Sequence, residues 1–194
     1  MTKYEQTKLI QVVLYILQKT GGIDFYHLFK ILYFAELKHL AKWGARITSD
    51  NFHALEYGPV PTCLYNVVKG QDVPDSGLLK LFSNVVRFAG KDAPNVLLPQ
   101  TEPDMDYISK SEIEALDASI DENEHLTFSQ LKSKSHDSAW YEAYNRLGSK
   151  TISSISMAEA SGADAATLEY IQEQMELEEA LSRRNSLICW MMIQ

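Results

Sequence analysis

The chain has 194 residues, a length sufficient for one well-buried domain with or without an appended segment. Its composition, 45% hydrophobic and 23% charged residues, is typical of a soluble globular protein. No run of about 18 uncharged apolar residues occurs, and Cys63 and Cys189 are too few and too isolated for a disulfide framework or a zinc site, so we expect no membrane insertion and a cytoplasmic location. The net charge of −8 is concentrated in residues 101–194, where 7 Lys and Arg face 18 Asp and Glu, and this excess disfavours direct nucleic-acid binding.

The first third of the chain predicts two helices. Apolar residues of segment 4–19 share one helical face, and Gly21 and Gly22 end that helix. Asp24 is suited to cap the next helix, which runs to Gly44 and is apolar over most of its circumference. We expect this second helix to be the buried centre of the fold. Its polar side chains on one narrow stripe are His27, Lys30, Lys38 and Lys42.

The rest of the chain predicts further helices and a small amount of β-structure. Residues 47–57 suggest an extended segment, residues 61–69 a short helix, and residues 85–99 a β-hairpin. Ser109 and Glu112 have the spacing of a capping box, Thr127 begins another helix, and residues 136–146 and 163–183 predict two more. The predicted fold is mainly α: a compact helical domain around a buried central helix, with a small antiparallel β-sheet or hairpin. We expect residues 1–160 to form this domain, and residues 161–194 a C-terminal amphipathic helix and apolar tail.

Two Glu-x-x-His pairs have the spacing of a metal half-site. Glu36 and His39 lie on the apolar side of the central helix, and Glu122 and His125 repeat the spacing at a helix end. The further carboxylates that such a site needs are not placed on a facing helix, so the alternative is a buried polar network. We predict that Glu36 and His39 are structural, with no metal and no cofactor.

The sequence offers little sign of catalysis. It contains no Gly-x-Ser-x-Gly turn, and its glycines are too scattered to form a phosphate-binding loop. His136 and Trp140, at helical spacing, could line a pocket or fill a helix junction, and we favour the structural role. The protein is therefore predicted not to be an enzyme.

Residues 57–61, Tyr-Gly-Pro-Val-Pro, concentrate turn chemistry between aromatic residues. Gly58 permits a positive φ or a close backbone approach, and Pro59 and Pro61 restrict the chain to few conformations. We expect a rigid, partly exposed loop, because a buried loop with two missing amide donors would leave carbonyl groups unpaired. Two readings remain open: the loop binds a partner, or it only turns the chain. The predicted partner-binding residues are Tyr57, Gly58, Pro59, Val60, Pro61 and Tyr65.

The C-terminal segment combines an acidic helix with an apolar end that includes Cys189, Trp190, Met191 and Met192. Such a segment either contacts a partner or docks back onto the domain. We predict partner contact or self-association for residues 163–194.

Two blocks of this sequence resemble the Panacea domain of SocA-like antitoxins from bacterial toxin–antitoxin systems. The first block runs from Lys30 to Asn66, and the second from Tyr107 to Tyr144. Together the resemblance spans about residues 5–160. Its motif residues here are Leu32, Tyr33, Phe34, Ala35, Glu36, His39, Ile47, Thr48, Tyr57 to Pro61, Ser109, His136 and Trp140.

The resemblance implies a mainly helical protein that neutralises a cognate toxin by direct protein–protein binding. The alternative function is that of a proteolysis adaptor or phage-borne regulatory protein that delivers a partner to a protease. The expected partners are thus a protein toxin, then a protease, and self-association into a homo-oligomer is a further candidate. Because the resemblance begins at about residue 5, we expect no added DNA-binding domain.

Overall fold

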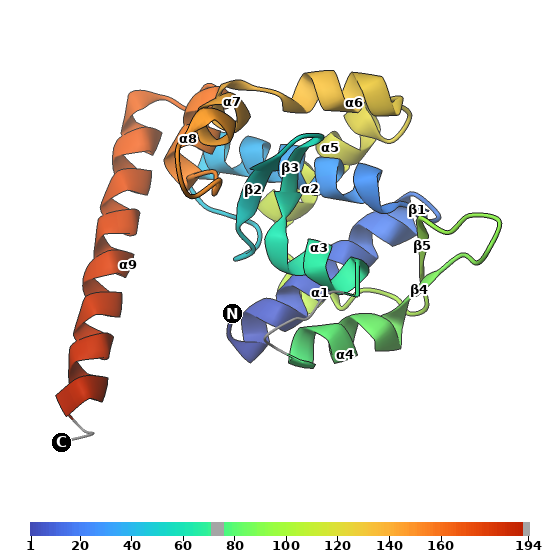
Figure 1. Cartoon of the computed structure of the whole chain (residues 1–194), viewed down its shortest axis with the longest axis horizontal. Coiled ribbons are helices and arrows are strands. Elements are labelled where there is room, and N and C mark those ends of the chain that lie inside the picture. The colour runs from blue at the N-terminus through green and yellow to red at the C-terminus, as the bar shows by residue number, and fades with distance from the viewer. Residues whose placement is uncertain (71–75, 192–194) are drawn as a thin grey trace.

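The computed structural model describes residues 1–70 and 76–191, and Figure 1 shows the arrangement of their helices and strands. The predicted fold class is confirmed: the chain is mainly α-helical, with two small antiparallel sheets. Within the described ranges, no helix is both long enough and apolar enough to cross a membrane.

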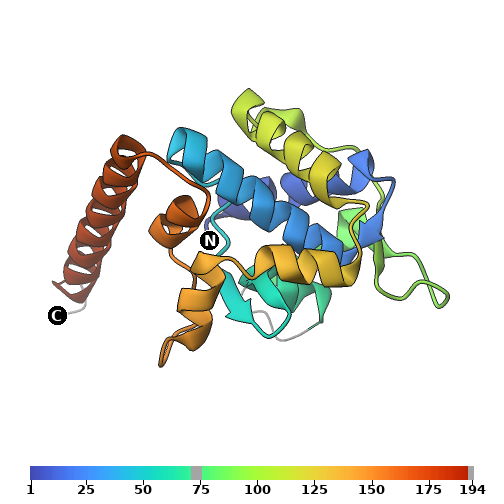
Figure 2. The ribbon, with the colours of Figure 1, turned by 90° about the horizontal axis from the view of Figure 1, so that it is seen from above.

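Helix α2 (Phe25–Trp43) is the centre of the fold, as predicted. The Asp24 side chain caps its start by accepting hydrogen bonds from the backbone N–H groups of Tyr26 and His27, and Gly44 ends it with a φ of 63°. From Leu28 to Leu40, every side chain except that of Lys38 is buried. Figure 2 shows α2 crossing the molecule between α5 (Lys110–Asn123) on one side and α6 (Phe128–Ser135) on the other.

Helix α1 (Lys3–Lys19) begins with a capping box between Thr2 and Glu5 and contributes a second continuous apolar face to the same core. It packs against α4 (Ser76–Val85), a helix that the sequence reading did not assign. The predicted hairpin forms from β4 (Val86–Phe88) and β5 (Val96–Pro99). A two-residue strand, β1 (Ile23–Asp24), adds to it and gives the order β1-β5-β4.

The second sheet is a hairpin of β2 (Phe52–Leu55) and β3 (Gly58–Pro61), followed by α3 (Thr62–Val68). Its register pairs Phe52 with Pro61 and Leu55 with Gly58. The buried Asp50 carboxylate accepts hydrogen bonds of 2.9 Å from the backbone N–H groups of both Cys63 and Leu64. Asp50 thereby caps α3 from outside the helix, a role that local sequence does not reveal.

The second half of the chain forms a layer around α2. After the short 3-10 helix η1 (Met105–Tyr107), α5 begins with the predicted capping box between Ser109 and Glu112. Helix α6 is capped by Thr127, and α7 (Ser138–Asn145) is capped by Asp137. Helix α8 (Ser154–Ala160) was not predicted, although its residues Met157 and Ala158 are fully buried.

The last helix, α9 (Ala165–Met191), is longer than the predicted segment 163–183. Its first turns pack on α8 and α2 through the buried Ile171. Met192 of the predicted C-terminal contact segment lies outside the described residues. The division of the chain at residue 160 stays a prediction. Helices α1 to α8 share one core, and α9 also contributes to that core.

Candidate functional site

The Tyr-Gly-Pro-Val-Pro stretch forms the tip and second strand of the β2–β3 hairpin. Glu56 and Tyr57 make the turn, and the Tyr57 side chain is 53% exposed. The expectation of a partly exposed loop is wrong for Gly58, Pro59 and Pro61, which are buried. The stretch can be buried because the Pro59 carbonyl accepts a hydrogen bond from inside the protein.

Gly58 is required at the start of β3 for two reasons. Its φ of +98° lies in the region that favours glycine, and a Cβ atom there would lie 2.5 Å from Ser135 Oγ and 2.6 Å from Lys30 Nζ. The prediction that Gly58 serves a positive φ or a close approach is confirmed, and both apply. The hairpin therefore sits directly against α2 and α6.

Lys30 is the donor that satisfies the Pro59 carbonyl. Its Nζ lies 2.8 Å from that oxygen and 5.0 Å from the centre of the Tyr26 ring. The side chain is fully buried, and in the described part of the chain it has no ion pair with a carboxylate. Burial lowers the pKa of Lys30 from 10.5 to about 7, and the Asp137 carboxylate opposes this only in part. The sequence placed Lys30 on a polar stripe and did not indicate its burial.

Tyr33, His136 and Trp140 join α2, α7 and the hairpin. The Tyr33 hydroxyl donates to the Asp137 carboxylate at 2.9 Å, and Trp140 Nε1 donates to the Leu55 carbonyl at 2.9 Å. The His136 ring stacks on the Trp140 ring with 3.6 Å between the ring centroids, and the Tyr144 ring also stacks on the Trp140 ring, at 4.6 Å. Burial, with the positive charges of Lys132 and Lys30, lowers the pKa of His136 and favours its neutral ring.

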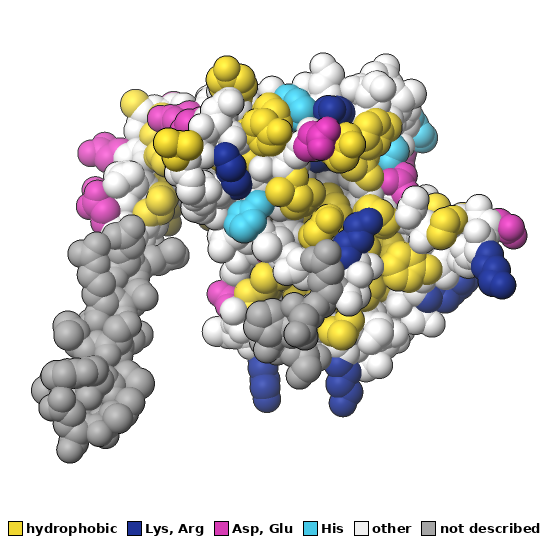
Figure 3. All heavy atoms as spheres, in the orientation of Figure 1, with side chains coloured by type: hydrophobic (Ala, Val, Ile, Leu, Met, Phe, Trp, Pro, Cys, Tyr) yellow, Lys and Arg dark blue, Asp and Glu magenta, His cyan; other side chains and the backbone are white. Residues whose placement is uncertain are grey.

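A partly exposed cluster of side chains surrounds the hairpin tip. The Phe128 ring, 46% exposed at the start of α6, lies 4.4 Å from the Tyr26 ring and 5.8 Å from the Tyr57 ring. The Tyr26 hydroxyl donates to the Tyr57 carbonyl at 3.1 Å, and Lys132 Nζ lies 5.0 Å from the Tyr57 ring centre. We call Tyr26, Tyr57, Phe128 and Lys132 the hairpin surface. Figure 3 shows hydrophobic side chains with basic ones among them on the face that carries the hairpin.

The other predicted contact residues lie elsewhere or deeper. Val60 is half-buried, and Tyr65 lies on α3 with its ring 6.2 Å from the Phe29 ring. The Tyr65 ring thus packs on Phe29 of α2. Sequence reasoning missed Phe128 and Lys132. The only signal for them was an aromatic residue directly after the Thr127 cap, where a helix start exposes its side chains.

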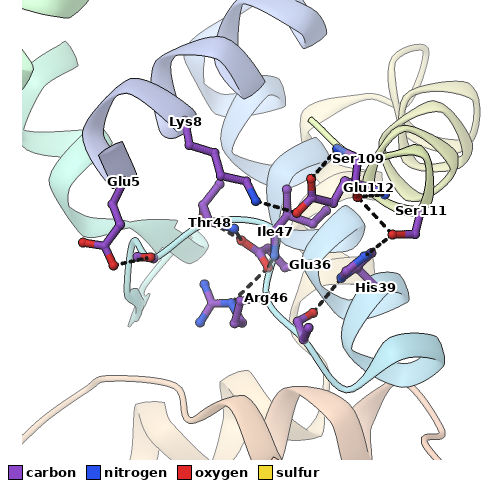
Figure 4. A network of polar contacts seen from close by, with 12 residues as sticks. Glu5, Lys8, Glu36, His39, Arg46, Ile47, Thr48, Ser109, Ser111 and Glu112 are labelled. Atoms are coloured by element: carbon purple, nitrogen blue, oxygen red, sulfur yellow. Dashed lines mark hydrogen bonds and ion pairs between the residues drawn. The ribbon is translucent and has the colours of Figure 1, made fainter. Parts of the chain in front are cut away.

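Glu36 and His39 take part in a buried polar network (Figure 4). The Glu36 carboxylate accepts hydrogen bonds from Arg46 Nε at 3.0 Å, from the Ile47 and Thr48 backbone N–H groups at 2.7 and 2.9 Å, and from Thr48 Oγ1 at 2.6 Å. His39 Nδ1 lies 2.7 Å from the Ala45 carbonyl, which can only accept, so this nitrogen carries a proton. These contacts fix residues 45–48 ahead of the hairpin.

The remaining histidine contact of this network joins α2 to α5. His39 Nε2 lies 3.1 Å from Ser111 Oγ. In the second Glu-x-x-His pair, Glu122 instead binds Lys38 and Lys134, and the His125 side chain is 86% exposed. Among the described residues, no group of three or more His, Cys, Asp or Glu side chains is arranged to hold a metal ion.

A family model for the antitoxin SocA-like, Panacea domain matches residues 28–141, more than half of the chain. The chain belongs to this family. No curated protein and no solved structure matched it. The matched part of the Panacea domain covers α2 from Leu28 onward, the hairpin, α5 and α6, and it contains Tyr57, Phe128 and Lys132. Tyr26, the fourth member of the hairpin surface, lies two residues before the match.

Proposed function

We propose that this Panacea-domain protein neutralises a cognate protein toxin in the cytoplasm by binding it directly, without catalysis. The observation that supports the proposal most strongly is the hairpin surface, where the exposed rings of Tyr57 and Phe128 lie beside the half-buried Lys132, and all three residues lie in the matched domain. Of the predicted binding residues 57–61 and Tyr65, we keep Tyr57 in the proposed site. We add its neighbours Tyr26 on α2 and Phe128 and Lys132 on α6.

The hairpin surface is held in place before a partner binds. Gly58 packs against Lys30 and Ser135, and the Tyr57 carbonyl accepts a hydrogen bond from Tyr26, so the turn cannot move without breaking these contacts. Ordering a loop is a large cost of association, and a preformed turn avoids it. Tyrosine and phenylalanine supply rigid contact area, while Lys132 adds a positive charge. We therefore expect the toxin to present an apolar group flanked by a carboxylate.

Co-expression with neighbouring genes tests this proposal. A neighbouring gene that stops growth alone should be tolerated when this protein is co-expressed. Phe128→Ala and Lys132→Glu should each weaken that rescue and lower the affinity in a pull-down of purified proteins. Tyr4→Ala, at 60% exposed on α1, is a matched control and should rescue fully. Failure to rescue growth from any neighbouring gene would reject the antitoxin function.

Measuring the toxin's half-life separates simple binding from delivery to a protease. Neutralisation by binding leaves the toxin level unchanged when this protein is present. A toxin that disappears only in cells with an active protease, and only with this protein, would instead establish the adaptor function.

A further inference from the structure

Helix α9 has two parts with different surroundings. Its first turns pack on the domain, with Ile171 2% exposed and Leu168 and Met175 partly buried against the core. From Gln172 to Leu181, every described side chain other than Met175 is exposed. Figures 1 and 2 show the helix at one edge of the molecule, extending beyond the other elements. The second part of α9 thus lacks the packing that stabilises most helices in proteins.

An apolar stripe runs along this exposed part. Leu177 is 53% exposed and Leu181 41% exposed, and they follow Tyr170, which is 47% exposed, at intervals of seven and four residues. These intervals place the three side chains on one helical face, as in the seam of a coiled coil. Leu177 and Leu181 lie on a different face from Leu168, Ile171 and Met175, which pack against the domain. The Tyr170 ring, at the start of the stripe, also lies next to Gly44 at the end of α2.

The charges of α9 indicate what covers this stripe. Residues 165–180 contain five Glu and no Lys or Arg, whereas residues 181–191 contain Arg183 and Arg184 and no Asp or Glu. A second α9 in antiparallel orientation would set the acidic part of each helix against the basic part of the other. A parallel pair would set like charges side by side, and a partner of a single charge would match only one part.

We infer that two copies of this protein associate through their α9 helices, paired antiparallel along Tyr170, Leu177 and Leu181. With the two-fold axis midway between positions 177 and 181, Leu177 of each copy lies opposite Leu181 of the other. The same register places positions 183 and 184 beside Glu173 and Glu176 of the second copy. One patch then serves both copies, as a two-fold interface requires. This pairing does not depend on toxin binding, because the hairpin surface uses other elements.

Sedimentation velocity of the full-length protein at micromolar concentrations tests the association. The wild type should sediment as a dimer. Leu177→Glu with Leu181→Glu should weaken dimerisation by at least about 100-fold, because the two leucines would lose their burial in the interface. Leu79→Glu is the matched control, since Leu79 is 39% exposed on another helix, and it should remain dimeric. Thermal unfolding should show that all three proteins are folded. A monomeric wild type, or a double variant that stays dimeric, would overturn the inference.

Charge exchange tests the orientation of the two helices. Arg183→Glu with Arg184→Glu should weaken an antiparallel dimer by about tenfold or more, because glutamates then face glutamates. Adding Glu173→Arg and Glu176→Arg to the same chain should restore the wild-type affinity, since opposite charges face each other again. In a parallel pair, each changed position faces the same position of the other copy, so replacing arginine by glutamate exchanges one like-charge pair for another. Unchanged affinity of the Arg183→Glu, Arg184→Glu variant would therefore overturn the antiparallel arrangement.

Discussion

Lys30 Nζ donates a 2.8 Å hydrogen bond to the Pro59 carbonyl and so connects the middle of α2 to the hairpin strand from inside the protein. The contact satisfies a carbonyl that would otherwise be buried without a partner, at the cost of burying an amine. It also places an ionisable group directly beneath the hairpin surface. The stability of the domain should therefore depend on the protonation of this one side chain.

Lys30→Met should change the pH dependence of stability. The folded protein lowers the pKa of Lys30 from 10.5 to about 7, so between these values the unfolded chain binds one more proton than the folded one. The free energy of unfolding of the wild type should thus rise with pH in this range, by up to about 1.4 kcal/mol per pH unit more than that of Lys30→Met. Urea unfolding of both proteins at pH 7, 8 and 9 measures the difference. Parallel profiles would show that Lys30 does not titrate in this range.

Glu36→Ala should lower the free energy of unfolding by about 3 kcal/mol. Without the carboxylate, the buried N–H groups of Ile47 and Thr48 lose their acceptor, and Arg46 loses its ion pair. Urea unfolding measures this loss, with Glu114→Ala, an exposed carboxylate on α5, as the control. A Glu36→Ala protein that unfolds like the wild type but no longer binds its toxin would assign Glu36 to the interface instead.

Tyr57→Ala should reduce toxin neutralisation far more than thermal stability, because the Tyr57 side chain is 53% exposed and its neighbour Phe128 is 46% exposed. Growth rescue and the melting temperature of the same variant provide the two readings. If Tyr57→Ala unfolds the protein while every folded hairpin variant still neutralises, the hairpin only turns the chain.

Gly58→Val should damage both neutralisation and stability. A valine at this position is strained at a φ of +98°, and its side chain would overlap Ser135 and Lys30. We expect the melting temperature to fall by more than about 8 °C, which corresponds to several kcal/mol in a protein of this size. Gly90→Val tests the backbone strain alone, since Gly90 has a φ of +122° but no neighbouring atom near its Cβ position. Equal losses in the two variants would mean that close packing at Gly58 adds nothing.

Asp50→Asn should destabilise the protein by about 2 kcal/mol, because the two N–H groups that start α3 bind separate oxygens of Asp50, and in asparagine one of these oxygens is replaced by an NH2 donor. The exposed residue Asp92 gives the matched control, and Asp92→Asn should change the unfolding free energy by less than about 0.5 kcal/mol. Chemical unfolding of the two variants compares them. Similar values would show that α3 does not depend on Asp50 as its cap.

Interactions between neighbouring residues were sufficient to predict where most helices begin and end. The Asp24 and Gly44 ends of α2 and the Ser109–Glu112 capping box of α5 are interactions between neighbouring residues, so a linear pattern reports them directly. The apolar circumference of α2 likewise predicted its central position. Helix α8 was missed because its seven residues are too few for a periodic pattern, and its burial comes from α2, α7 and α9 around it.

The sequence by itself determined the family motif, the central helix and the need for glycine at position 58. Only the tertiary structure decided which residue of the lysine stripe of α2 is buried. On a helical wheel Lys30 shares its stripe with Lys38 and Lys42, but the hairpin and α6 cover Lys30 alone. The hairpin surface was decided in the same way. Tyr57 and Phe128 are 71 positions apart in the numbering, and they meet because α6 folds back over α2 beside the hairpin. Such contacts depend on how distant elements pack, which no local pattern of residues records.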